Sequence, residues 1–417
     1  MPAPDCQVDV LIFGGGIAGL WTFARLAREG YSCLLLESRS LGAGQTIASQ
    51  GIIHGGIKYA LTGEASRASR AIAEMPALWQ ACLAGRGEVD LSSAAVLSTH
   101  QHLWTTAGIG SRLVGVAASK AIRTEVSRIA ADERPAAFAA APRSVDLYRV
   151  DEPVLDPASV LRALAAPGLG RMALCRSISR TTFHSGGAIT ITAALATSLG
   201  SHPGVECRIN ARAVVLAAGE GNASLLERFA PGGAHAPRPA QQLRPLHMVM
   251  ARAPLDAPQP PALYGHCVGL TDKPRLTITT QRDSRARTVW YIGGQISERG
   301  VSSSPAALID ETRRELAACV PWVPLDGFQW STLRVNRAEG LSPAGARPDE
   351  PVVHACAGVI TLWPTKLAFA PLAAALVLER LRAQGVEPAG CAAALPDGLL
   401  TPPVAPLPWE QEDRQWT

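Results

Sequence analysis

The stretch DVLIFGGGIAGLWTFARLAREGYSCLLLES, residues 9–38, determines the expected fold of the N-terminal part. Its first residues, DVLIF, form a continuous apolar run, which is typical of a parallel strand covered on both faces. Residues 17–29 then place apolar side chains at helical spacing, and Gly30 ends that pattern. Residues 31–37, YSCLLLE, read as a second buried strand. The order strand, helix, strand predicts a right-handed βαβ unit.

A glycine motif occupies the first strand-to-helix junction. Gly14, Gly16 and Gly19 have the spacing G-x-G-x-x-G, and Glu37 closes the next strand. In such a turn the first glycine permits the tight bend, the second lets backbone amides approach a pyrophosphate, and the third lets helix and strand pack closely. The helix N-terminus favours the phosphates. Glu37 can accept hydrogen bonds from both ribose hydroxyls and would repel a 2′-phosphate, so NADP is disfavoured and NAD and FAD remain.

Three further segments favour FAD over NAD. Residues 41–61, LGAGQTIASQGIIHGGIKYAL, are rich in residues whose backbone and side-chain donors suit a pyrophosphate, a ribityl chain and a ring. Residues 213–222, AVVLAAGEGN, supply a small-residue turn to pack against the first glycine loop. Residues 363–371, WPTKLAFAP, place amides and a cation at a helix start, where they can face an electron-rich ring edge.

Together these segments define the predicted cofactor contacts, and no metal site is expected. Nine cysteines are scattered singly without a C-x-x-C pair, which argues against a zinc site and against a disulfide framework. The residues expected to contact FAD are Gly14, Gly15, Gly16, Ile17, Ala18, Gly19, Glu37, Ser38, Arg39, Gln45, Thr46, Ser49, Gln50, Gly51, Ile53, Ala218, Gly219, Thr365, Lys366 and Leu367.

Residues 8–61 resemble the D-amino-acid oxidase superfamily of flavoenzymes. Within them, ASQGIIHGGIKYAL is similar to a motif of flavin-dependent glycerol-3-phosphate dehydrogenase and of L-2-hydroxyglutarate oxidase. The resemblance implies an FAD domain joined to an antiparallel substrate domain. It also implies oxidation of a CH–OH or CH–NH bond by hydride transfer to flavin N5.

The same resemblance implies roles for particular residues. Lys58 and Tyr59 match a basic–tyrosine pair that helps to hold the phosphate in glycerol-3-phosphate dehydrogenases. The PTKLA segment resembles their Gly-Gly-Lys-Leu-Thr motif and implies that Lys366 lies beside the flavin, although Pro364 and Thr365 replace the two glycines. A solvated lysine is the alternative for Lys366.

His54, Arg334 and Arg337 complete the candidate catalytic residues. His54 lies between two apolar residues and two glycines, and its ordinary pKa suits a group that accepts the substrate proton. The alternatives are a core histidine bonded to a carbonyl, or covalent attachment to the flavin as in some relatives. In STLRVNR, Arg334 is the approximate counterpart of the superfamily's Gly-x-Arg-Pro arginine, and both arginines suit a carboxylate or phosphate. Surface ion pairs are the alternative.

The expected architecture is α/β, with a Rossmann-like FAD-binding domain and an interleaved antiparallel-sheet substrate domain. Residues 275–281 and 287–294 alternate apolar and polar residues around a polar turn, which predicts an antiparallel hairpin with one covered face. We expect the FAD-binding domain to comprise residues 1–90, 145–240 and 330–395, and the substrate domain residues 91–144 and 241–329. Residues 396–417 are rich in proline and predict an extended tail.

Composition and missing motifs narrow the function. With 47% hydrophobic and 18% charged residues and a net charge of +4, the chain is typical of a globular protein that binds no nucleic acid. No apolar run is long enough to span a membrane, so we expect a cytoplasmic protein or one peripheral to the inner membrane. A second G-x-G-x-x-G for a nicotinamide is missing, so electrons should come from an organic substrate and leave to oxygen, a quinone or a partner protein.

These observations predict an FAD-dependent dehydrogenase or oxidase acting on the CH–OH bond of a small anionic molecule, either a 2-hydroxy acid or a polyol phosphate. Two alternatives stay open. One is an amino-acid or secondary-amine oxidase or dehydrogenase, and the other is a flavin-carrying subunit of a larger complex.

Overall fold

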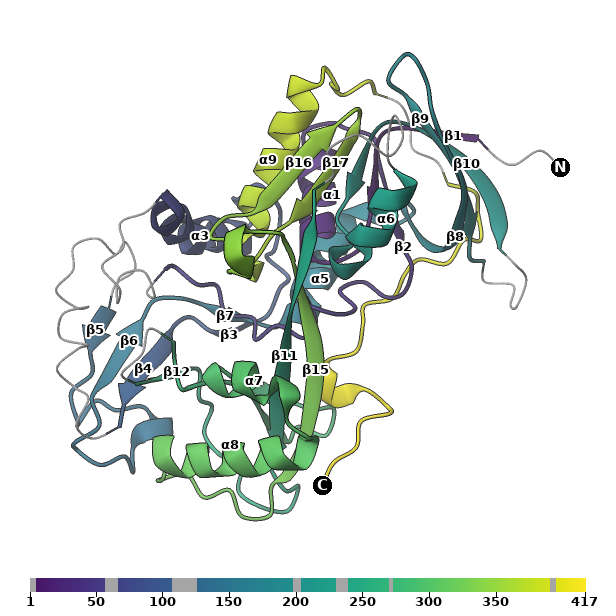
Figure 1. Cartoon of the computed structure of the whole chain (residues 1–417). Coiled ribbons are helices and arrows are strands. Elements are labelled where there is room, and N and C mark those ends of the chain that lie inside the picture. Colours follow the sequence, from purple (N-terminus) through teal and green to yellow (C-terminus); the bar gives the residue numbers. More distant parts are fainter. Residues whose placement is uncertain are drawn as a thin grey trace.

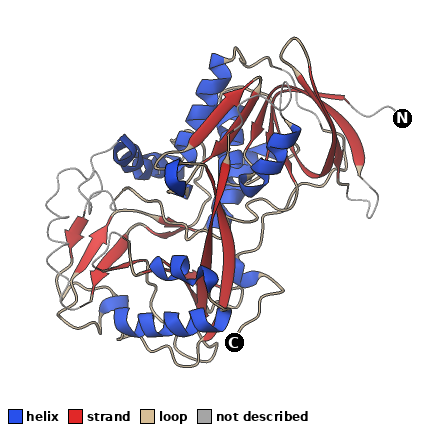
Figure 2. Cartoon of the chain, viewed as in Figure 1, coloured by secondary structure: helices blue, strands red, loops and turns tan. Residues whose placement is uncertain are grey.

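The computed structural model describes residues 5–56, 67–106, 126–197, 204–229, 239–269, 273–390 and 395–417. In this part of the chain the strands form a seven-stranded sheet, an eight-stranded sheet and a small two-stranded sheet. Figure 1 shows the seven-stranded sheet and its helices at the top and the eight-stranded sheet below, joined by two long strands. Helices flank both sheets (Figure 2).

The seven-stranded sheet contains the predicted βαβ unit. Strand β1 pairs in parallel with β2 and β10, and β10 pairs in parallel with β17. Helix α1 (Ile17–Arg28) connects β1 to β2 and packs against α9 (Ala370–Ala383). The predicted α/β class with a Rossmann-like unit is confirmed. The strands of this sheet are β1 (Asp5–Phe13), β2 (Cys33–Glu37), β8 (Met172–Phe183), β9 (Ile189–Leu195), β10 (Val205–Leu216), β17 (Val359–Trp363) and β16 (Val352–Cys356).

The apolar run of β1 is explained by burial on both faces. Val10 and Ile12 pack with α1 and α9 in one core cluster, whereas Leu11 packs on the opposite face with β9 and β10. None of these three side chains is exposed to solvent. Because each buried aliphatic side chain contributes roughly 1.5–3 kcal/mol, the strand is fixed firmly beneath the glycine turn.

The eight-stranded sheet carries the predicted hairpin. Strands β13 and β14 pair antiparallel, and α8 (Pro305–Cys319) packs on one face of them through a core that includes Trp290. The prediction that only one face is covered was wrong, because Tyr291 is buried on the other face against Trp409 of the C-terminal segment. The strands in sheet order are β15 (Gln329–Gly340), β11 (Gln241–Arg252), β14 (Thr288–Gly293), β13 (Leu276–Arg282), β12 (Gly265–Val268), β4 (Gln101–Thr105), β6 (Leu147–Val150) and β5 (Val126–Arg128).

Strands β11 and β15 link the two sheets. They pair antiparallel along twelve residues each and run from the eight-stranded sheet up to the seven-stranded one (Figure 1). Near their upper end, β15 contacts β17. The expected domain boundaries at residues 145 and 330 place β6 and β15 with the FAD-binding domain, although both strands belong to the eight-stranded sheet. We keep the division into two domains as a proposal, with these strands assigned to the second.

The C-terminal segment lies along both sheets rather than standing free. Leu41 forms a parallel bridge with Val404, and Leu174 donates a backbone hydrogen bond to Leu400. At the far end, Thr417 exchanges two backbone hydrogen bonds with Trp330 of β15. The segment therefore runs from β8 of the seven-stranded sheet to β15, an edge strand of the eight-stranded sheet.

The remaining elements are short or peripheral. Helix α3 (Arg67–Leu83) packs against the first sheet's helices through Trp79, whose ring lies 4.6 Å from that of Trp21. No helix in the described ranges is both long and apolar enough to cross a bilayer. The other elements are β3 (Val96–Ser98), β7 (Val154–Leu155), α5 (Pro157–Ala165), α6 (Asn222–Arg228), α7 (Gln295–Arg299) and the 3-10 helices η1 (Ala136–Phe138), η2 (Ala166–Gly168), η3 (Gly219–Gly221), η4 (Gly300–Ser302), η5 (Pro343–Gly345), η6 (Leu367–Phe369) and η7 (Pro408–Glu410).

Candidate active site

The glycine turn between β1 and α1 has the geometry of a dinucleotide cradle. Gly14 has φ +105°, and a Cβ atom there would lie 2.6 Å from the carbonyl oxygen of Ala217. A Cβ atom on Gly19 would lie 1.9 Å from the carbonyl oxygen of Gly14. Side chains at either position would therefore push the helix away from the strand ends. Gly16 and Gly19, at the start of α1, carry no side chain that could keep a phosphate from the backbone amides.

Glu37 lies directly beside this turn. One carboxylate oxygen accepts a 2.6 Å hydrogen bond from the amide of Gly15, and the other accepts one from the amide of Arg39 at 2.8 Å. The hydroxyl of Ser38 donates to that second oxygen at 3.4 Å. Gly16 is the N-cap residue of α1 and supplies no side-chain cap. An acid at the end of the second strand, next to a glycine turn at a helix N-terminus, is the arrangement that holds an adenosine ribose and a pyrophosphate.

The loop after β2 brings polar groups under the same turn. The Thr46 hydroxyl accepts a 3.1 Å hydrogen bond from the amide of Ile17. Further along the loop, Gly51 packs so closely that a Cβ atom there would lie 1.9 Å from the carbonyl oxygen of Leu155. The hydroxyl of Ser49 is buried and lacks a hydrogen-bond partner in the described part of the chain. Such a group is suited to a polar atom of a bound cofactor. Among the predicted contacts in these segments, the side chains of Ile17, Ala18, Thr46 and Ile53 are buried.

Two glutamines of this loop bind the eight-stranded sheet instead of projecting freely. The side-chain oxygen of Gln45 accepts a 3.1 Å hydrogen bond from the amide of Ala338 in β15. The side-chain nitrogen of Gln50 donates to the carbonyls of Thr277 at 3.1 Å and Tyr291 at 2.9 Å. These hydrogen bonds hold the loop that follows β2 (residues 38–56, called the cofactor loop below) against β13, β14 and β15. The predicted substrate domain therefore lies against the predicted cofactor contacts.

The strand ends of β10 and β17 complete the floor of the site. Asn222 accepts a hydrogen bond from the amide of Ala218 at 2.8 Å and donates to the carbonyl of Leu362 at 3.0 Å, so it holds the two strand ends together. Sequence reasoning missed this residue, although it follows the small-residue turn that carries Gly219. The turn with Gly219 at φ +57° thus lies next to the PTKLA segment.

The PTKLA segment begins with a strained turn. Thr365 has φ +65°, is buried, and donates to the carbonyl of Glu350 at 3.0 Å. Its own carbonyl accepts a 2.9 Å hydrogen bond from Arg347. The Lys366 ammonium lies 5.1 Å from the ring centroid of Phe369, and both Lys366 and Leu367 are partly exposed. A non-glycine residue held at positive φ is typical of functional turns.

The ring of His54 lies beside a carboxylate that the sequence did not point to. Its Nδ1 lies 3.5 Å from Oε2 of Glu152, whose side chain is completely buried. The carboxylate also accepts hydrogen bonds from the amide of Gly55 and from Nε2 of Gln101, each at 2.5 Å. Glu152 comes just after β6, about a hundred residues along the chain, so local sequence carried no signal for the pairing.

Two buried histidines of the eight-stranded sheet, His266 and His102, are neutral at physiological pH. The His266 ring stacks on His54 with centroids 5.7 Å apart, and its Nδ1 lies 2.8 Å from the Thr277 hydroxyl. Burial, together with the nearby His54, lowers the pKa of His266 to about 3. Burial likewise lowers the pKa of His102 to about 4. Because the histidine pKa is ordinarily near 6.5, neither ring carries charge when the protein is folded at neutral pH.

The two candidate arginines of β15 have different surroundings. Arg334 donates to the carbonyls of Val301 and Ser303 beside η4 and is exposed. Arg337 has a side chain only 14% exposed, and its guanidinium lies 3.4 Å from Glu298 of α7. The two arginines are therefore not brought together, and Arg334 is occupied with backbone carbonyls.

Arg337 belongs to a cluster of charged side chains. Arg244 faces it across the β11–β15 pair, and Glu298 lies within ion-pair distance of both and of Lys273. Arg244 also pairs with the fully buried Glu339 at 3.2 Å. Burial lowers the pKa of Arg337, and the charge of Arg244 lowers it further, but a guanidinium remains charged at neutral pH. The cluster can present guanidinium groups to an anion.

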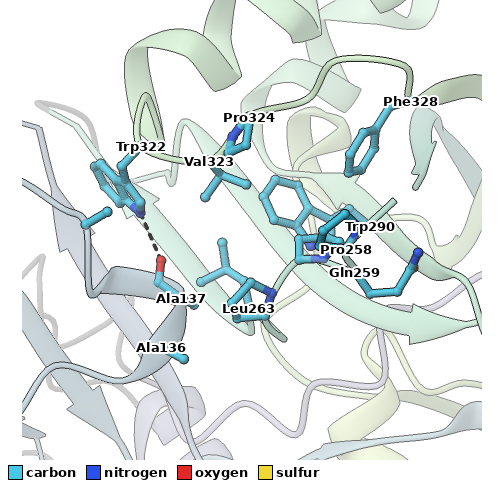
Figure 3. A pocket seen from close by; sticks show the side chains of 13 residues that line it. Ala136, Ala137, Pro258, Gln259, Leu263, Trp290, Trp322, Val323, Pro324 and Phe328 are labelled. Carbon is cyan, nitrogen blue, oxygen red and sulfur yellow. Dashed lines mark hydrogen bonds between the residues drawn. The ribbon is translucent and has the colours of Figure 1, made fainter. Parts of the chain in front are cut away.

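One cavity lies apart from this arrangement, and two of the predicted residues are not described. Lys58 and Tyr59 fall outside the described residues. A cavity of about 240 Å³ lies beside Trp290, Trp322 and Phe328 in the eight-stranded sheet's domain, and its lining is almost wholly apolar (Figure 3). Trp290 packs with the α8 core, on the opposite face of the sheet from Tyr291, so this cavity is not the site described above.

Comparisons with known proteins agree with the FAD cofactor that the sequence predicts. The family model described as "FAD dependent oxidoreductase" (DAO) matches residues 9–379. The chain is 43% identical over 405 residues to the Pseudomonas aeruginosa protein named "Probable FAD-dependent oxidoreductase PA4991", covering 97% of this chain and 98% of that one. The crystal structure of PA4991 superposes with a TM-score of 0.78 at 39% identity and covers 98% of this chain and 99% of that chain.

More distant solved structures share the fold. Glycine oxidase from Geobacillus kaustophilus has a TM-score of 0.60 at 16% identity, covering 94% of this chain and all of that chain. L-alpha-glycerophosphate oxidase from Mycoplasma pneumoniae, solved with FAD bound, has a TM-score of 0.58 at 14% identity, covering 90% and 95%. With the family model spanning most of its length, the chain belongs to the DAO family and is an FAD-dependent oxidoreductase.

Proposed function

We propose that this enzyme oxidises the CH–OH bond of a small anionic substrate, either a 2-hydroxy acid or a polyol phosphate. In this proposal His54 accepts the hydroxyl proton, and Arg337 with Arg244 binds the anionic group. The observation that carries it is the His54 side chain, which lies on the cofactor loop with Nδ1 next to a buried carboxylate and with 41% of its surface exposed.

The bound FAD supplies the acceptor for the hydride that leaves the substrate carbon. His54 supports this by removing the hydroxyl proton, since a base that is positioned within hydrogen-bond reach contributes roughly 10²–10⁴-fold to a rate. The Nδ1 side of the ring faces Glu152, and one ring face is covered by His266. Nε2 is therefore the nitrogen that we propose for the substrate.

The charged cluster supports an anionic substrate. Arg337 is largely enclosed and Arg244 lies opposite it, so an anion that enters between them would meet two guanidinium groups with limited competition from water. We further propose that Lys366 faces the flavin edge from the strained Thr365 turn. The roles of Lys58 and Tyr59 in holding an anionic group remain proposals from the family resemblance.

Anaerobic reduction of the flavin tests this function. The purified enzyme is mixed with 2-hydroxy acids, glycerol-3-phosphate, amino acids and N-methylated amines, and the loss of the flavin's blue absorption is followed by stopped flow. Rapid bleaching by a hydroxylated anion is the expected result. Bleaching by an amine alone would replace the proposal with amine oxidation, and a flavin that no substrate reduces would favour a carrier subunit. Reoxidation by oxygen, a quinone or an added protein then identifies the acceptor.

A further inference from the structure

Glu152 divides its hydrogen bonds unequally between its two oxygens. Oε1 accepts the amide hydrogen of Gly55, and Oε2 accepts from Nε2 of Gln101 and lies 3.5 Å from Nδ1 of His54. Gly55 follows His54 directly, so one carboxylate fixes both the backbone next to the histidine and its ring. All donors converge on a side chain with no solvent exposure.

A buried carboxylate without a positive partner is strongly disfavoured. The groups that face this pair from the surrounding strands are His266 of β12 and Gln101 of β4. Burial lowers the pKa of His266, so its ring is neutral, and the amide of Gln101 carries no charge. Among these neighbours, His54 is therefore the group whose positive charge, once the ring gains a proton, the negative charge of Glu152 can balance.

We infer that Glu152 is a positioning residue that keeps the hydrogen of neutral His54 on Nδ1, so that Nε2 presents its lone pair to the substrate. This inference rests on the proposed role of His54. When the substrate's O–H bond breaks, its proton bonds to Nε2, and the hydrogen on the adjacent carbon leaves with its electron pair to the FAD. The imidazolium that results is held by the carboxylate, in the way that an acid orients a general-base histidine in other enzymes.

Glu152→Gln separates this role from simple packing. The amide hydrogen of Gly55 requires an oxygen, so the glutamine must place its nitrogen at the Oε2 position, where it donates toward Nδ1. His54 should then carry its hydrogen on Nε2, the tautomer that accepts no proton there. Expected results are a switched tautomer in the ¹⁵N NMR spectrum of histidine-labelled protein and flavin reduction slowed at least 100-fold. The Kd of the substrate should change less than threefold.

Gln101→Met is the matched control. It removes a hydrogen bond from the same buried oxygen but leaves the carboxylate, so the tautomer should be retained and the reduction rate should stay within a few-fold of wild type. The resonance of His54 is assigned by its loss in His54→Ala. If Glu152→Gln does not fold, the wild-type spectrum still decides the matter, because neutral His54 with its hydrogen on Nε2 would overturn the inference.

The outcomes separate this inference from the proposed function. An unchanged tautomer and rate in Glu152→Gln, alongside slow reduction in His54→Ala, would refute the positioning role and leave His54 as the base. Wild-type reduction in His54→Ala would instead refute the proposed role of His54. A slow Glu152→Gln with the Nδ1 hydrogen retained would also refute the inference, since the loss would then arise from structure alone.

Discussion

The ring of Trp409 lies against that of Tyr291, with centroids 5.7 Å apart and planes at 62°, while the Tyr291 hydroxyl donates a 2.9 Å hydrogen bond to the carbonyl of Ala48. One tyrosine therefore contacts the C-terminal segment on one side and the cofactor loop on the other. The packing of residues near the C-terminus is in this way connected to the position of the loop that carries the predicted cofactor contacts.

Trp409→Ala should consequently destabilise the enzyme and weaken its hold on FAD. Replacing a buried tryptophan with alanine typically lowers the free energy of unfolding by about 3–5 kcal/mol. Thermal unfolding followed by circular dichroism and by flavin fluorescence measures both effects. Trp416→Ala is the control, because that ring is partly exposed and lies 3.8 Å from the Arg252 guanidinium, a contact worth roughly 0.5–1 kcal/mol. Equal losses in the two variants would contradict the connection.

Gly19→Ala should yield protein that binds little FAD. The added Cβ atom would lie 1.9 Å from the carbonyl oxygen of Gly14, so α1 must move away from β1 and distort the cradle. The ratio of flavin to protein absorbance after purification, and the Kd for added FAD, give the readout. Gly186→Ala introduces the same methyl group where no atom lies within 4 Å, and this variant should bind FAD normally. If Gly19→Ala contained as much FAD as the wild-type protein, the glycine turn would tolerate the displacement of α1, and the prediction would be wrong.

Arg337→Lys and Arg334→Lys should differ in their effect on substrate affinity. A lysine at 337 keeps the charge but loses the paired donors, and charge-assisted hydrogen bonds are worth roughly 1.5–3 kcal/mol, so KM should rise about tenfold or more. Arg334 donates to two carbonyls at η4, so its replacement should lower stability and leave KM nearly unchanged. Steady-state kinetics with the substrate found by flavin bleaching decides the comparison. A larger KM effect at position 334 would reverse the assignment.

Local patterns predicted the βαβ unit beneath the proposed cofactor site because they encode local structure. The glycine spacing, the buried strand and the acid at the next strand end all lie within residues 9–38, and the structure places Glu37 on the amide of Gly15. The hairpin of β13 and β14 was likewise predicted correctly, from the alternation of apolar and polar residues on either side of a polar turn. Its second covered face was missed, since Trp409 reaches it from the C-terminal segment.

The pairings that complete the site depend on distant segments. Glu152 meets His54 because β6 joins the second sheet while the adjoining loop returns to the cofactor segment, and no periodicity reports such a contact. Likewise, Arg334 and Arg337 are three residues apart and so point to opposite faces of β15, but the sequence STLRVNR does not show what lies beside either face. Their environments differ because α7 lies beside Arg337 whereas η4 lies beside Arg334.

The buried His266 should make the enzyme less stable in acid. Its pKa is lowered to about 3 in the folded state, whereas an unfolded histidine titrates near 6.5. Between these values the unfolded chain binds a proton that the folded protein does not, so the free energy of unfolding falls by about 1.4 kcal/mol per pH unit below 6.5 and is unaffected above it. At pH 5 the loss is about 2 kcal/mol. Urea unfolding of wild type and His266→Gln at pH 7 and pH 5 measures it: the variant should lose about that much less on acidification, and an identical loss in both proteins would contradict the burial of a neutral ring.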